Sequence, residues 1–161
     1  MGYNSGNIQL EVNPMSGNQR LSGIVLVVTG IVVAVHTVVE PLYHVSTEGS
    51  PYSPLWTYIN WLTLLSIALG VFYSYIRTKD AGGSGGDGPV TREYLVACIQ
   101  LYGFLFVGIL FLWNWFQLFS PEYTAVAAEV NSVVWIFIDA AVPLLTVPLG
   151  LHLCCGARKS Q

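Results

Sequence analysis

Charged side chains are scarce in this sequence. Of its 161 residues only 9% are Asp, Glu, Lys or Arg, whereas 53% are hydrophobic. A soluble domain usually carries about 25% charged residues. The shortage argues against a soluble domain, and a formal net charge of −3 argues against a nucleic-acid-binding surface. The composition instead indicates a chain that lies largely in lipid.

Two of the connections between apolar segments lack Lys and Arg altogether. The apolar segments lie at residues 21–39, 55–76, 94–119 and 125–153, and each meets the ~20 residues that a bilayer core requires. The connections at 44–54 and 120–129 contain no basic residue. Cytoplasmic loops concentrate Lys and Arg. We therefore predict a plasma (inner) membrane protein with both termini in the cytoplasm, because all basic residues flank the other segment ends: Arg20, Arg77, Lys79, Arg92, Arg158 and Lys159.

The lipid around the apolar segments determines the fold class. Lipid offers no hydrogen bonds to the backbone, so spanning segments must be helices. The sequence predicts an all-α membrane protein, a bundle of four transmembrane helices at 21–155, between a polar N-terminal tail at 1–20 and a cytoplasmic tail at 156–161. Pro41 is expected to end the first helix.

The bundle could also consist of two duplicated helical hairpins. A shift of 80 positions aligns Pro41 with Pro121 and Tyr43 with Tyr123. Two hairpins of equal orientation would be related by an axis along the membrane normal. Duplication is thus a hypothesis about the origin of the bundle.

Motifs for catalysis are also lacking. The glycine-rich stretch at 81–89 has no Gly-Lys-Ser/Thr ending to bind phosphate, and no Ser-His-Asp or Cys-His spacing is present. Cys98, Cys154 and Cys155 all lie toward the cytoplasmic ends of their segments, so the outer loops cannot carry a disulfide framework. These features favour a protein without catalytic activity.

One acidic residue falls near the middle of a span. Asp139 has no Lys or Arg within any span to neutralise it, and burying a carboxylate in lipid is costly, so it should face the bundle interior, a cavity or a partner. Pro143, four residues later, removes a backbone hydrogen bond to its carbonyl. With Asn60 and Asn114 in the same half, Asp139 predicts an intramembrane polar site. The alternative is an Asp that joins two helices by hydrogen bonding.

A second group of polar residues lies at the outer end of the first segment. His36, Glu40 and His44 are spaced four apart, and the first two share a helix face. These residue types ligate Cu, Zn or Fe. They are therefore candidate metal ligands, alone or with Asp139, although no cofactor is fixed by the pattern. The alternative is a His and a Glu solvated at the membrane interface. Haem bound by His36 and His152 is disfavoured, since they lie at opposite ends of their spans.

Small and aromatic residues also follow patterns. Ser66, Gly70 and Ser74 are spaced four apart in the second segment, which suits close helix packing. The five Trp residues map to the outer half, where interfacial anchoring explains them and a binding surface is the alternative: Trp56, Trp61, Trp113, Trp115 and Trp135.

The leading functional prediction is a non-catalytic accessory or structural subunit of a larger integral membrane complex. Its partners would be the lipid bilayer and other membrane subunits or a second copy, and not nucleic acid. One alternative is a small metal- or redox-cofactor-binding membrane protein that uses the outer His/Glu/Asp cluster. A second alternative is a small proton-coupled transporter acting through Asp139.

Overall fold

The computed structural model describes residues 17–47, 50, 52–82, 90–120 and 127–156. These residues form four helices: α1 (Gly17–Tyr43), α2 (Trp56–Gly82), α3 (Arg92–Gln117) and α4 (Ala128–Gly156). All four are long and apolar enough to cross a membrane, so the prediction of an all-helical chain with four candidate spans is confirmed. Residues 1–16, the loop at 83–89, and Arg158 and Lys159 lie outside the described residues.

The helix ends differ from the predicted ones. The expectation that Pro41 ends the first helix is wrong, because α1 continues through it to Tyr43. Proline removes only its own hydrogen bond, and the final turn is closed by the backbone N–H of His44, which donates to the Glu40 carbonyl at 2.9 Å. The third helix ends at Gln117, two residues before the predicted end, in a turn of shorter-range hydrogen bonds.

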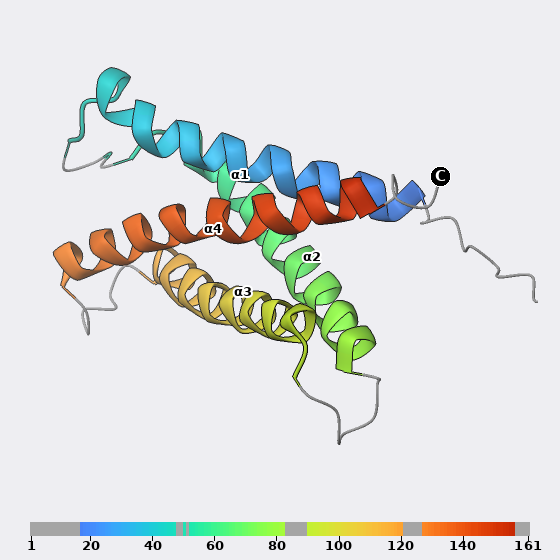
Figure 1. Cartoon of the computed structure of the whole chain (residues 1–161). Helices are drawn as coiled ribbons and strands as arrows, with labels where there is room; N and C mark the ends of the chain where they lie inside the picture. The colour runs from blue at the N-terminus through green and yellow to red at the C-terminus, as the bar shows by residue number, and fades with distance from the viewer. Residues whose placement is uncertain (1–16, 48–49, 51, 83–89, 121–126, 157–161) are drawn as a thin grey trace, which may run out of the picture.

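The helices pack in two antiparallel pairs. α1 lies along α4 and α2 lies along α3, and these are the two most extensive contacts between elements (Figure 1). α1 and α3 begin at the end of the bundle where α2 and α4 finish, and we call this the basic end. The described Lys and Arg residues all lie there: Arg20, Arg77, Lys79 and Arg92.

Small residues let the paired helices approach closely. A Cβ atom on Gly150 of α4 would lie 2.6 Å from the backbone carbonyl oxygen of Gly23 in α1. Gly70 of α2 faces the ring of Phe104 in α3 in the same manner. Without a hydrophobic force between helices in lipid, such close contact is a main source of association.

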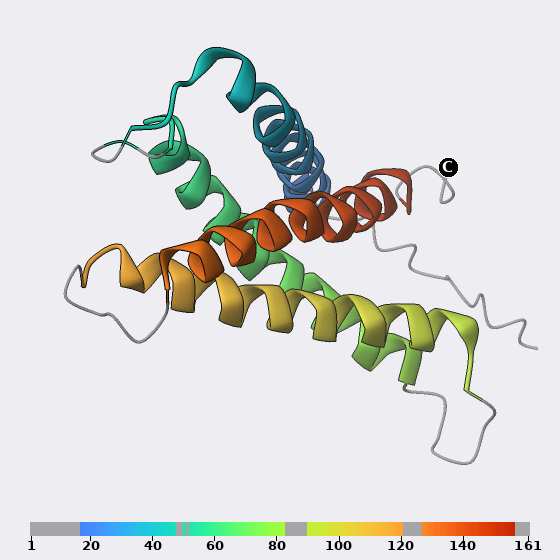
Figure 2. The ribbon, with the colours of Figure 1, turned by 90° about the vertical axis from the view of Figure 1, so that its left-hand side faces the viewer.

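Polar groups connect the two pairs inside the bundle. The Ser66 hydroxyl of α2 donates to the Thr29 hydroxyl of α1 at 2.8 Å, and both residues are fully buried. Ser74, two turns further along α2, is buried as well. At the opposite end α1 and α2 diverge (Figure 2), and a cavity lies there.

Candidate functional site

A large cavity lies at the end opposite the basic end. Its volume is about 860 Å³, and its walls come from α1, α2, α4 and the connection between α1 and α2. Two acids, Glu40 and Asp139, belong to the lining, and no Lys, Arg or His does among the described residues. The polar lining continues with an amide and hydroxyls, and the apolar lining is aromatic and aliphatic: Asn60, Thr37, Thr57, Tyr52, Ser132, Trp56, Trp135, Ile136, Leu118 and Pro54.

Each oxygen of the Glu40 carboxylate accepts one hydrogen bond. One oxygen accepts the backbone N–H of Ser53 at 2.7 Å, and the other accepts the indole N–H of Trp56, also at 2.7 Å. Hydrogen bonds to an ionised acceptor are shorter and stronger than neutral ones. Glu40 therefore holds the start of α2 and the preceding connection against the end of α1.

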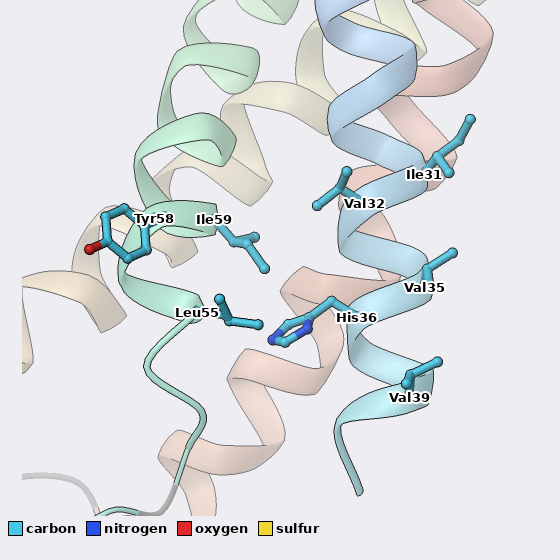
Figure 3. A pocket seen from close by; sticks show the side chains of 8 residues that line it. All are labelled: Ile31, Val32, Val35, His36, Val39, Leu55, Tyr58 and Ile59. Carbon is cyan, nitrogen blue, oxygen red and sulfur yellow. The ribbon is translucent and has the colours of Figure 1, made fainter. Parts of the chain in front are cut away.

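His36, one turn before Glu40 on α1, contacts the aromatic residues Tyr43 and Trp56. The Tyr43 hydroxyl lies 3.1 Å from His36 Nδ1 and donates to the Ser53 hydroxyl at 3.2 Å. The Trp56 ring contacts the imidazole edge-on, with centroids 4.7 Å apart. Figure 3 shows the imidazole pointing from α1 toward Leu55, into a separate apolar pocket of about 470 Å³ between α1 and α2.

The three predicted metal ligands do not share one site. His44 lies in the connection, where Nε2 is 3.2 Å from the Ser50 carbonyl oxygen, while His36 and Glu40 have the partners given above. Within the described ranges, no three His, Cys, Asp or Glu side chains come together as a metal site. The side chains thus have separate structural contacts.

Asp139 and Asn60 both line the cavity. Asp139 is half-buried on α4, and it forms no hydrogen bond or ion pair with a described residue. Asn60 is only 8% exposed, and its amide also makes no hydrogen bond within the described part of the chain. Neither polar atom of this amide is among the buried side-chain atoms that lack a hydrogen-bond partner, so the amide is open to water or a ligand in the cavity.

Asn114 does not join this site. It is fully buried on α3, and its Nδ2 donates to the backbone carbonyl of Asn131 at 3.3 Å. The amide therefore connects α3 to α4 beside the cavity, and its own oxygen has no hydrogen-bond partner among the described atoms.

Sequence reasoning missed the residues that close the cavity. The Tyr52 hydroxyl donates to the Ser132 hydroxyl at 3.0 Å, which ties the connection to α4 across one side of the opening. Ser53 and Trp56 hold Glu40 from another side. The sequence predicts Trp56 as an interfacial aromatic residue, but it does not predict the hydrogen bonds that Trp56 and Tyr52 make.

A carboxylate, a buried amide and aromatic walls around one cavity can bind and orient a small molecule. No protein-family model, curated protein or solved structure matches the chain.

Proposed function

We propose that the chain is a non-catalytic membrane protein that binds a small polar solute in the cavity at the end opposite the basic end. The observation that carries this proposal is the presence of two polar groups without a described hydrogen-bond partner, Asp139 and Asn60, in the lining of one cavity. Both groups have hydrogen-bonding capacity that no described residue uses and that a bound solute could use. The volume of about 860 Å³ falls within the usual range of small-molecule pockets.

We further infer that this cavity opens to the outside of the cell. The described basic residues all lie at the basic end, and Arg158 and Lys159 follow α4 in the sequence. Since Lys and Arg concentrate in cytoplasmic segments, this distribution supports cytoplasmic termini in the plasma membrane.

Cysteine accessibility tests both statements. In a chain whose Cys98, Cys154 and Cys155 are replaced by Ser, Asn60→Cys should react with a membrane-impermeant maleimide added to intact cells. The reason is that a solute-binding cavity must admit water to this buried position. Thr63→Cys is the matched control, because Thr63 is 3% exposed, lies about one turn further along α2 and does not line the cavity. It should stay unlabelled.

The other outcomes contradict the proposal in different ways. Labelling of Asn60→Cys only after the membrane is permeabilised would reverse the orientation. Absence of labelling under both conditions would mean that the cavity is closed to water, and the binding function would be wrong.

The accessory-subunit function remains a second proposal, favoured by the outward face of α3. Large apolar side chains are exposed there at alternating spacings of four and three residues, the spacing that faces a partner helix. They form one row along the helix: Leu95, Ile99, Tyr102, Phe106, Ile109, Trp113 and Phe116. We propose that a transmembrane helix of a partner subunit packs on this row.

Purification in mild detergent tests the partner. A stoichiometric partner should co-purify with the native chain and be lost from the double variant Tyr102→Ala, Phe106→Ala, which shortens the row. Val38→Ala is the control, since Val38 is 74% exposed on α1, and it should keep the partner. A native chain that purifies only as a monomer would contradict the proposal.

We also infer that the bundle arose by duplication. In two hairpins related by a two-fold axis, the α1–α4 and α3–α2 pairs are equivalent, and these are the two most extensive contacts. Gly70 and Gly150, 80 positions apart, both face the first helix of a hairpin, although Gly103 faces α4 instead. Superposition of residues 17–76 on 97–156 in an experimental structure, by a rotation of about 180°, would support the inference.

The two remaining candidate functions stay predictions. A metal or redox site would draw on Glu40, whose carboxylate is engaged by Ser53 and Trp56. A proton-coupled transporter would use Asp139, which lines the same cavity that we assign to solute binding.

A further inference from the structure

We propose that the solute bound in this cavity is an organic ammonium ion, a primary or secondary amine with an apolar body, and that Asp139 is its counter-ion. The inference rests on the proposed binding function and names the class of solute.

The charge of the lining selects a cation. Glu40 and Asp139 contribute acids, and no described basic residue lies in the lining to balance them. The described Lys and Arg residues lie at the far end of the bundle. A low-dielectric cleft lined by one sign of charge concentrates ions of the other sign.

Asp139 is the acid that can meet the cation directly. Both carboxylate oxygens of Glu40 already accept hydrogen bonds, from Ser53 and Trp56. The carboxyl of Asp139 has no such donor among the described residues. An ammonium N–H donating to a carboxylate is a strong, charge-assisted hydrogen bond.

The amide of Asn60 favours an amine that carries N–H groups. Its oxygen can accept a second N–H from the same ammonium, and its buried position beside the cavity leaves that oxygen without another described donor. A quaternary ammonium has no N–H group to donate to this oxygen.

The walls suit the remainder of such a molecule. Trp56 and Trp135 line the cavity, and indole rings attract cations at their faces. Ile136, Leu118 and Pro54 offer apolar contact to a hydrocarbon body. A bare metal ion fits less well, because no three ligating side chains are grouped in the described chain and the volume of about 860 Å³ far exceeds one ion.

A matched pair of probes tests the charge. 2-Phenylethylamine and 2-phenylethanol have nearly the same shape, but only the amine is a cation near neutral pH. Isothermal titration calorimetry on the full chain in lipid nanodiscs should give at least tenfold tighter binding of the amine. Asp139→Asn should abolish this difference, because the isosteric amide keeps the size of the side chain and removes its charge.

Asp80→Asn is the control variant. Asp80 is an exposed acid near the end of α2, at the basic end, so its loss should leave the preference for the amine unchanged. A preference that survives Asp139→Asn, or disappears equally in Asp80→Asn, would overturn the assignment of the counter-ion.

Failure of this inference can be told apart from failure of the binding function. Equal binding of amine and alcohol, or binding of neither, by a native chain whose Asn60→Cys form is labelled from outside would overturn the inference alone. Should Asp139→Asn fail to fold, the comparison of the two probes on the native chain still decides, and Asn60→Ala should weaken amine binding several-fold.

Discussion

Glu40 fastens two parts of the chain that are separate in sequence. Its oxygens accept N–H groups from Ser53, in the connection after α1, and from Trp56, at the start of α2. These contacts hold the connection that forms one wall of the cavity. At the scale of single residues, Glu40 therefore has a structural role in the site, and under the proposed function Asp139 binds the solute.

Replacing Glu40 by Gln should destabilise the protein. The amide keeps one acceptor but turns the other into a donor that faces the indole N–H of Trp56. Hydrogen bonds to charged groups contribute about 1.5–3 kcal/mol each, so the free energy of unfolding should fall by about 1–3 kcal/mol. Unfolding of the purified protein in detergent, followed by circular dichroism, measures the change.

Glu129→Gln is the control for this variant, because Glu129 is exposed in the first turn of α4. It should be neutral within about 0.5 kcal/mol, as surface substitutions usually are. If Glu40→Gln proved as stable as the native chain, the two short hydrogen bonds of Glu40 would not hold the start of α2 and the preceding connection against the end of α1.

The residues of the site could be predicted only in part from the sequence. Asp139 and Asn60 were expected to form a polar site because membrane depth can be counted along a helix. The role of Glu40 could not be predicted, since its partners depend on how the connection after α1 folds back. The spacing of His36, Glu40 and His44 predicted that Glu40 is a metal ligand, but its carboxylate accepts hydrogen bonds from Ser53 and Trp56.

At the scale of helices, the α1–α4 contact depends on the absence of a side chain at Gly150. A Cβ atom there would lie 2.6 Å from the Gly23 carbonyl oxygen and 3.0 Å from the Val27 nitrogen, both backbone atoms. Backbone cannot rotate away as a side chain can. The two helices would have to move apart, and their remaining contacts would be lost.

Gly150→Leu should therefore lower the free energy of unfolding by about 1–3 kcal/mol, the usual cost of overpacking. Gly17→Leu is the control, because a Cβ on Gly17 meets nothing within 4 Å. Leu is a better helix former than Gly, so this control should be neutral or slightly stabilising. Equal stability of the two variants would contradict the close packing of α1 on α4.

The helices themselves were predictable because apolar length is a strong signal. Their ends and pairing were not. Pro41 was expected to stop α1, but a proline in a final turn removes a single hydrogen bond and the turn persists to Tyr43. Pairing of α1 with α4 depends on which small residues face each other, and nearly every face of these helices is apolar.

The orientation of the whole molecule in the membrane decides on which side of the membrane the cavity opens. We expect the distribution of Lys and Arg to set it, so moving basic charge across the membrane should disturb it. The test variant combines Arg20→Gln and Lys79→Gln at the basic end with Val45→Lys and Phe119→Lys at the opposite end. Val45 is 82% and Phe119 is 68% exposed, so the new charges need no burial.

This variant should insert in both orientations, whereas the native sequence inserts in one. The reporter is Asp80→Cys in a chain whose three native cysteines are replaced by Ser. An impermeant maleimide should label it in intact cells only when the chain is inverted. The control carries Val45→Glu and Phe119→Glu instead, and it should keep the native orientation because acids contribute little to topology. If the Lys variant kept a single orientation, basic charge would not be what directs the cavity outward.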